Sequence, residues 1–231
     1  MKNDFEYYYN NVPGKGLCRN NLIYTSLVNK ERTVFCQWYH NDTEYHRGQN
    51  QVVDPSLMEE KWHRELKYIT LMNDFYPEHI PVILDIDLTH RKIFYAIDGD
   101  DFWQQSFTSN YDTVLPNWQE QMLSIFKAHK DLGIYKYSLH PSSYFVVDGK
   151  LKSINYFFCY ENTDPIISLS SVMSHISEDR QADLFPKMAE LGIDVDKPTP
   201  FTDIQLLAFE SFKTNFPNDF MNAAIKLYEQ H

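Results

Sequence analysis

The amino-acid sequence predicts an α+β protein built on a two-lobed plan. Segments rich in β-branched and aromatic residues fill most of the first hundred positions and surround one amphipathic helix, which is typical of an antiparallel sheet with a helix packed on it. Beyond a joint near residues 98–103 we expect a compact, mainly helical lobe, because helical periodicity dominates there. The chain should form a single domain over residues 1–231, with an amino-terminal lobe (1–98) and a reduced carboxy-terminal lobe (99–231).

Composition and charge narrow the classes of partner. With 43% hydrophobic and 16% aromatic residues, the chain can bury a substantial core. The net charge of -11 disfavours nucleic acid, whose phosphates require clustered Lys and Arg. The first ten residues, MKNDFEYYYN, lack the apolar core of a secretory signal, and no apolar run approaches the length of a membrane span. We expect a cytoplasmic protein that binds neither nucleic acid nor membrane.

The cysteines predict neither a disulfide framework nor a zinc site. Cys18, Cys36 and Cys159 are odd in number and lie far apart in the sequence. This usage fits a reduced compartment and agrees with the expected cytoplasmic location.

The amino-terminal strands have clear sequence signals. Residues 22–29 and 33–40 are rich in β-branched and aromatic residues and flank three polar residues, which predicts a hairpin. Residues 4–10 supply a further strand, and residues 79–88 and 91–98 supply two more.

One helix separates these two groups of strands. Asp54 can cap its first turn, and Pro55 suits the first helical position. Its apolar stripe consists of Trp62, Ile69 and Met72. Glu65 lies within that stripe, where it either reaches water at the edge or is buried and needs a partner.

The second half begins with an amphipathic helix over 116–133, followed by a loop and a hairpin. Asp148-Gly149 between two apolar runs is a strong hairpin signal. Helical patterns follow at residues 165–176, 188–192, 202–212 and 220–228.

The loop and hairpin carry the motif that matters most for function. The segment LGIYKYSLHPSSYFVV is followed by DGKLKSINYF. In spacing and in element order this resembles the protein-kinase-like superfamily, whose pattern is H-x-D, an Asn five residues later, a short hairpin, and D-F-G. The resemblance covers roughly residues 17 to 160 and implies a two-lobed, protein-kinase-like fold.

Aligned on that pattern, the catalytic positions hold the wrong residues. Ser138 falls where the family has its catalytic Asp, and Lys136 falls where it has His. Ser143 replaces the metal-binding Asn, and Asn155 replaces the Asp of D-F-G. A serine hydroxyl is no general base near neutral pH, and magnesium on phosphates is usually held through carboxylates.

The amino-terminal lobe shows the same losses. Under the resemblance Gln37 replaces the phosphate-pairing Lys of the third strand, and Phe35 replaces a small residue that lines the adenine pocket. Glu65 matches the helix glutamate that normally pairs with that Lys, so we expect a bond from Gln37 to Glu65. Phe35, Gln37, Asp98 and Asn155 are the residues expected at the cleft.

The leading hypothesis is therefore a catalytically inactive kinase-like protein that acts by protein binding or scaffolding and needs no cofactor. The alternative is an atypical ATP- and magnesium-dependent phosphotransferase that uses displaced carboxylates such as Asp148, Glu161 or Asp164. A third reading is a small-molecule-binding module that keeps the cleft without the phosphate chemistry.

Two further groups of residues have side chains that could form a site. His40, Asp42, Glu44 and His46 could bind a divalent metal or form a solvated loop; we favour the loop and expect no metal site. The carboxylates near the joint are interpreted as turn and surface residues; they are Asp85, Asp87, Asp98, Asp100 and Asp101.

Overall fold

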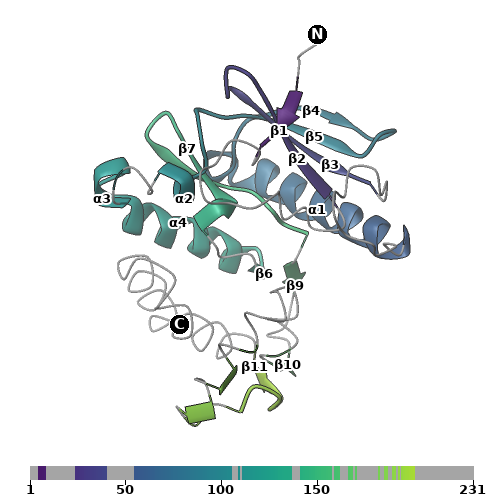
Figure 1. Ribbon diagram of the computed structural model, residues 1–231, viewed down its shortest axis with the longest axis vertical. Coiled ribbons are helices and arrows are strands. Elements are labelled where there is room, and N and C mark those ends of the chain that lie inside the picture. The colour runs from purple at the N-terminus through teal and green to yellow at the C-terminus, as the bar shows by residue number, and fades with distance from the viewer. Residues whose placement is uncertain are drawn as a thin grey trace. The chain divides into compact units, whose positions relative to one another are not determined.

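One antiparallel sheet organises the amino-terminal part of the protein (Figure 1). Its five strands are β1 (Phe5–Tyr7), β2 (Tyr24–Asn29), β3 (Val34–Tyr39), β4 (Ile83–Asp87) and β5 (Lys92–Ala96). They lie in the order β1-β2-β3-β5-β4, and each neighbouring pair is antiparallel. The protein is thus of the α+β class, with the expected hairpin formed by β2 and β3.

The computed structural model describes part of the chain and divides it into two compact units. The described residues are 5–8, 24–40, 55–105, 109, 111–136, 141–157, 159–161, 166–168, 170, 182, 185–186, 189–190, 192 and 194–200. One unit comprises residues 1–118 and 138–159, and the other comprises 119–137 and 160–231. None of the helices in the described residues is long and apolar enough to cross a membrane.

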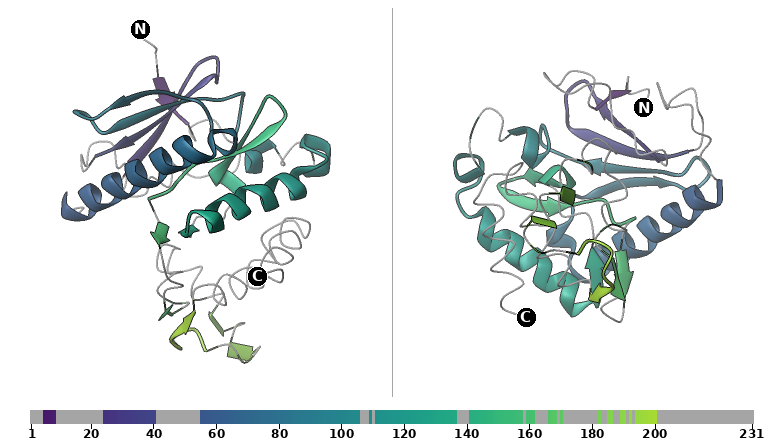
Figure 2. Two further views of the ribbon diagram at one scale, coloured as in Figure 1. Left: turned by 180° about the vertical axis from the view of Figure 1, so that it is seen from behind. Right: turned by 60° about the horizontal axis from the view of Figure 1, so that its bottom comes forward.

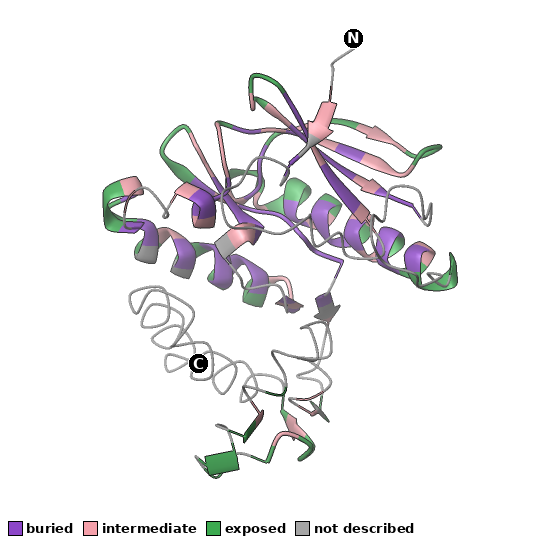
Figure 3. Cartoon of the chain, in the orientation of Figure 1, coloured by how far each residue is buried: buried purple, intermediate pink, exposed green. Residues whose placement is uncertain are grey.

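Helix α1 (Pro55–Phe75) runs along one face of the five-stranded sheet, as both views in Figure 2 show. Its buried residues recur every three or four positions, so one side of the helix faces the sheet (Figure 3). They are Met58, Lys61, Trp62, Glu65, Tyr68, Ile69 and Met72. The helix begins at Pro55, as expected, and the predicted cap Asp54 lies outside the described residues.

Alternation along β3 decides which side chains reach the core. Phe35, Gln37 and Tyr39 are buried on one face of the sheet, while Cys36 and Trp38 point to the other face. Tyr95 lies directly opposite Phe35 in the register of β3 and β5, so its side chain shares the face of Gln37. This register determines which polar groups meet in the core.

A second hairpin belongs to the same unit. It consists of β7 (Tyr144–Val147) and β8 (Lys150–Ser153), preceded by a 3-10 turn, η2 (Pro141–Ser143). Asp148 and Gly149 form the turn, with φ of 50° and 68°. Positive φ at both central residues fits the right-handed twist of the strands, so the hairpin predicted from Asp-Gly is confirmed.

Three short helices belong to this part of the chain. η1 (Pro77–His79) lies between α1 and β4, and α2 (Phe102–Gln105) and α3 (Tyr111–Val114) follow β5. The rings of Phe102, Tyr111 and Trp118 pack together with centroids 4.5 to 5.9 Å apart. The Trp118 indole also donates to Asp112, at 2.9 Å, which satisfies its polar atom.

The expectation of a two-lobed protein-kinase-like fold with a compact, mainly helical carboxy-terminal lobe is wrong. Apart from Trp118 and Cys159, which belong to the first unit, the described residues of the second unit contain α4 (Trp118–Asp131) and the strands β6 (Ile134–Lys136), β9 (Cys159–Glu161), β10 (Ile166–Ile167) and β11 (Thr199–Pro200). Residues 170, 182, 185–186 and 189–190 are helical, and the last two lie within the helix predicted at 188–192. β10 pairs with β11, so the helix predicted over residues 165–176 is wrong at residues 166–167; residue 170 is helical, and residues 171–176 lie outside the described residues. A short apolar run has no period that separates strand from helix, which explains the error. The helices predicted at 202–212 and 220–228 lie outside the described residues.

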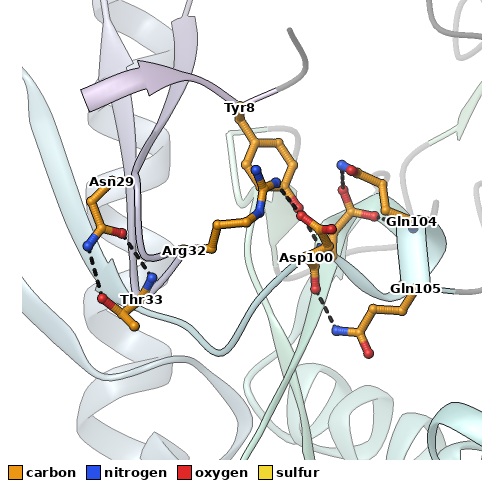
Figure 4. A network of polar contacts seen from close by, with 8 residues as sticks. Tyr8, Asn29, Arg32, Thr33, Asp100, Gln104 and Gln105 are labelled. Atoms are coloured by element: carbon orange, nitrogen blue, oxygen red, sulfur yellow. Dashed lines mark hydrogen bonds and ion pairs between the residues drawn. The ribbon is translucent and has the colours of Figure 1, made fainter. Parts of the chain in front are cut away.

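The Asn29 side chain stabilises the turn between β2 and β3 through hydrogen bonds (Figure 4). Asn29 Oδ1 accepts the backbone N–H groups of Thr33 and Val34 at 2.9 and 2.7 Å. Asn29 Nδ2 donates to Thr33 Oγ1 at 2.9 Å. Arg32, at the end of the turn, has a φ of 53°, so the side-chain bonds hold a backbone conformation that is costly for a residue other than glycine.

We predict that Asn29→Ala lowers the free energy of unfolding by about 1–3 kcal/mol, because two backbone donors lose their acceptor. Urea denaturation would measure the change. Lys30→Ala, at an exposed neighbouring position, is the control and should change stability by less than about 0.5 kcal/mol. Equal stability of the two variants would show that the Asn29 bonds do not hold the turn.

Candidate functional site

Three of the residues predicted at the catalytic positions meet in one buried chain of hydrogen bonds. Gln37 Nε2 donates to Asn155 Oδ1 at 2.6 Å, and Asn155 Nδ2 donates to Ser143 Oγ at 3.0 Å. Gln37 is fully buried, Ser143 is 1% exposed and Asn155 is 8% exposed. Within the described residues neither amide contacts a Lys or Arg side chain. The donors and acceptors therefore satisfy one another without any charge.

Local backbone structure places Asn155 in this chain. Ile154 follows the end of β8, and Asn155 comes next. The Ile154 N–H donates to the carbonyl oxygen of Ser143 at 2.9 Å. Asn155 itself has a φ of 67°. Asparagine tolerates this left-handed conformation better than most residues, so its amide can turn toward both Gln37 and Ser143.

Glu65 is fully buried at the centre of α1, so the alternative in which it reaches water is wrong. The expected bond from Gln37 to Glu65 is also wrong. Tyr39 Oη donates to Glu65 Oε2 at 3.1 Å. Tyr95 Oη lies 3.2 Å from Gln37 Oε1 and 3.5 Å from Glu65 Oε1, and thus bridges the amide and the carboxylate. We call these six residues the central network: Gln37, Tyr39, Glu65, Tyr95, Ser143 and Asn155.

Burial fixes the protonation of the two tyrosines. Desolvation, followed by the charge of Glu65, raises the pKa of Tyr39 well above 10. The same two causes raise the pKa of Tyr95 well above 10. Both hydroxyls therefore keep their protons at neutral pH. Tyr39 donates its proton to the carboxylate, and Tyr95 shares its single proton between Gln37 Oε1 and the more distant Glu65 Oε1, which partly offsets the cost of burying the carboxylate.

Aromatic rings fill the space beside Gln37 on the same strand. The Phe35 ring packs on the rings of Tyr8 and Phe145, each with a centroid distance of 5.2 Å. It also lies 6.4 Å from the ring of Tyr95. Phe35 is 3% exposed, so the position that the resemblance assigns to an adenine pocket is occupied by packed side chains.

Tyr8 is held in place by groups from the β2–β3 turn and from the segment before α2 (Figure 4). The Arg32 guanidinium lies over its ring, 5.0 Å from the centroid, and forms an ion pair with Asp100. The backbone N–H of Asp101 donates to Tyr8 Oη. The buried Asp101 carboxylate accepts from the Gln104 backbone and side chain, so it is a structural cap rather than the surface carboxylate that we expected.

The other predicted residues do not join the central network. Asp98, a cleft candidate, is exposed. Lys136 is buried in β6 of the other unit, and Ser138 lies outside the described residues. His40 Nε2 is hydrogen-bonded to Thr25 Oγ1 at 2.6 Å. Asp42, Glu44 and His46 are outside the described residues. In the described part of the chain no group of three His, Cys, Asp or Glu could hold a metal.

Sequence reasoning missed Tyr8, Tyr39, Tyr95 and Phe145. Tyr39 shares a strand face with Gln37, two residues away, so strand alternation could have found it. Tyr95 and Phe145 depend on strand register and on the position of the hairpin, which the sequence does not specify locally.

Comparison with known proteins gives no relative for this chain: no protein-family model matches it, and neither does any curated protein. The chemistry of the site therefore has to be argued from its own geometry. It contains hydroxyls, neutral amides and one buried carboxylate.

We predict that Tyr39→Phe is less stable than the parent at pH 7 by about 1.5–3 kcal/mol, because the Glu65 carboxylate loses a donor. The deficit should shrink above pH 10. A tyrosine with a raised pKa in the folded state stabilises fully below its unfolded pKa of about 10, and this stabilisation is lost as pH rises through the folded value. Urea denaturation at pH 7, 9 and 11 would measure it.

The control for this experiment removes buried volume without an ionisable group. Ile69→Val, in the same core, should cost about 0.5–1.5 kcal/mol and keep the parent's loss of stability at high pH. A pH profile of Tyr39→Phe that parallels that of Ile69→Val would contradict the role assigned to the hydroxyl.

We predict that Asn155→Asp, which restores a carboxylate at this position, destabilises the protein at pH 7 by at least about 2 kcal/mol. The reason is that a charge is buried beside two neutral partners. The deficit should decrease toward pH 4, as the introduced carboxyl takes up a proton. Asn73→Asp, at an exposed position of α1, is the matched control and should leave the thermal midpoint nearly unchanged. If Asn155→Asp were as stable as Asn73→Asp, the central network would accommodate a charge.

Proposed function

We propose that this chain is a catalytically inactive protein that acts by binding another protein, with a degenerate form of the protein-kinase-like loop-and-hairpin motif at its centre. The observation that carries the proposal is the mutual hydrogen bonding of Gln37, Ser143 and Asn155. Under the resemblance these positions would hold the phosphate-binding lysine and the two metal ligands.

The chemistry of phosphoryl transfer supports this reading. The protein's contribution to that reaction is positioning and charge neutralisation by cations and magnesium. Gln37 supplies no cation, and Ser143 and Asn155 supply no carboxylate for magnesium. In addition, each of the three side chains is buried and already bonded, so a nucleotide would have to break these bonds before it could be bound.

The packing of Phe35 supports it independently. Its ring touches the rings of Tyr8 and Phe145, which come from two other parts of the chain. To admit a planar base, these rings would have to separate, at a cost similar to that of opening a core cavity. The interior thus favours its own packing over a nucleotide.

The proposal that the protein acts by binding another protein follows from the loss of the groups that phosphoryl transfer requires. A folded domain without a reaction acts through its surface, and the described surface exposes six large apolar side chains, among them Phe75, Val82 and Leu88. We propose a cytoplasmic location, which the buried thiol of Cys36 supports, because it is not part of a disulfide.

The alternative, an atypical phosphotransferase, needs a carboxylate near the central network. Asp148 is exposed in the β7–β8 turn, at the opposite end of the hairpin from Ser143 and Ile154. Glu161 belongs to β9, and Asp164 lies outside the described residues. The described geometry therefore favours the inactive protein.

We predict that ATP with magnesium does not stabilise the protein. A ligand present at a hundred times its dissociation constant would add about 2.7 kcal/mol and raise the thermal midpoint by roughly 5–11 °C. We expect a change below about 2 °C at millimolar ATP and magnesium chloride, measured by differential scanning fluorimetry with an active kinase as the positive control.

The opposite outcome is equally clear. Magnesium-dependent turnover of ATP by the purified chain that disappears in Asn155→Ala would show that the central network is an active site and would overturn the proposal. Turnover that persists in Asn155→Ala and co-purifies with the chain would support the alternative that uses displaced carboxylates and would also overturn the proposal, whereas turnover that further purification removes comes from a contaminating enzyme.

A further inference from the structure

The outer edge of β4 exposes apolar side chains that the core does not use. β4 is the last strand of the sheet, so one side of its backbone has no neighbouring strand within the described residues (Figure 1). Val82, Leu84 and Leu88 are 66%, 52% and 66% exposed, and all lie within seven residues of one another. Leu84 lies in β4 itself, whereas Val82 directly precedes the strand and Leu88 begins the turn that follows it. Single exposed apolar residues are common, but three within and beside one edge strand form a surface that favours association.

A bulge explains why Leu84 faces outward. The pairing of β4 with β5 shifts its register between Ile83 and Asp85, so that Leu84 is the extra residue. Ile83 and Ile86, on either side, are half-buried, whereas Leu84 is exposed. The sequence thus places a large apolar side chain at an exposed position of this strand, next to the exposed Asp85.

The Asp85 carboxylate gives this edge a negative charge. Asp85 is exposed, and its Oδ1 accepts only the neighbouring N–H of Ile86, at 2.9 Å. No Lys or Arg of the described residues pairs with it. Asp87, by contrast, is bonded to the backbone and the ring of His90. A carboxylate without a cation therefore lies directly beside an exposed leucine.

We propose that the β4 edge, defined as Val82, Leu84, Asp85 and Leu88, binds an extended segment of another protein in which apolar residues alternate with Lys or Arg. The free backbone edge adds the segment as a further strand, the exposed apolar side chains contact its apolar residues, and Asp85 pairs with its cation. This inference rests on the proposed function in one respect, namely that the protein acts by binding another protein.

The same features argue against the other occupants. A second copy of this chain paired through β4 would bring two Asp85 carboxylates to one edge, and each chain carries a net charge of -11. A helix offers no free backbone groups to the edge of a sheet. Because the Ile86 N–H is already bonded by Asp85, the added strand is short, and side chains supply most of its specificity.

The test uses the full chain and two end-blocked, fluorescein-labelled heptapeptides, one of alternating lysine and valine and one of alternating glutamate and valine. Fluorescence anisotropy should show at least about tenfold tighter binding of the lysine peptide. Leu84→Lys should weaken that binding by at least about tenfold, because it buries a like charge at the contact. Asp85→Asn should weaken it by up to about fivefold, as expected for one exposed ion pair.

The matched control is Leu57→Lys, which makes the same substitution at an exposed leucine of α1. It should bind the lysine peptide as the parent does. Hydrogen–deuterium exchange should show protection of residues 82–86 on peptide binding, and unchanged urea midpoints should confirm that each variant folds.

Three outcomes would overturn the inference. They are absence of binding of the lysine peptide by the parent, equal binding by Leu84→Lys and Leu57→Lys, and self-association of the parent in analytical ultracentrifugation that Leu84→Lys abolishes. The last result would identify a second copy as the occupant. ATP turnover, measured on the same preparation, tests the proposed function separately, so failure of one is distinguishable from failure of the other.

Discussion

The hydrogen bond from Gln37 Nε2 to Asn155 Oδ1 joins two segments that are 118 residues apart in the sequence. It connects the middle of β3 to the residue that follows the β7–β8 hairpin, and the rest of the core is arranged around it. Tyr95 extends the chain of bonds to Glu65 on α1, and Ser143 extends it to the turn before β7. Because all these groups are buried, each must find a partner inside the protein, so the sheet, helix and hairpin can assemble in only one register.

The neutrality of that bond has a physical consequence. A buried ion pair must overcome the desolvation of two charges, and its attraction often only balances that cost. Two amides avoid most of the cost and still provide direction. Glu65 remains as the one carboxylate of the central network, and the donors from Tyr39 and Tyr95 provide part of what a cation would supply. A site arranged in this way gains structural specificity and loses the charges that phosphoryl transfer requires.

Local signals predicted the elements whose causes are local. The β2–β3 hairpin follows from residue composition, the β7–β8 hairpin from Asp148-Gly149, and the start of α1 from Pro55. The partners of Gln37 and Glu65 could not be found in this way, since they depend on the β3–β5 register and on the left-handed backbone of Asn155. The error at residues 166–167 has the same origin: β10 exists because it pairs with β11, more than thirty residues away, and periodicity contains no information about a distant partner.

The interior and the surface of this protein lead to one conclusion about how it can act. Inside, Phe35 packs on Tyr8 and Phe145, and the amides of Gln37 and Asn155 bond to each other, so binding a nucleotide would require breaking contacts that stabilise the fold. Outside, the bulge in β4 turns Leu84 toward solvent beside Asp85, at an edge where a ligand displaces mainly water. A ligand at the edge therefore incurs the ordinary ordering and desolvation costs of association, whereas a ligand in the core must in addition offset the energy of the contacts it displaces. This asymmetry is the physical basis of the proposed surface recognition.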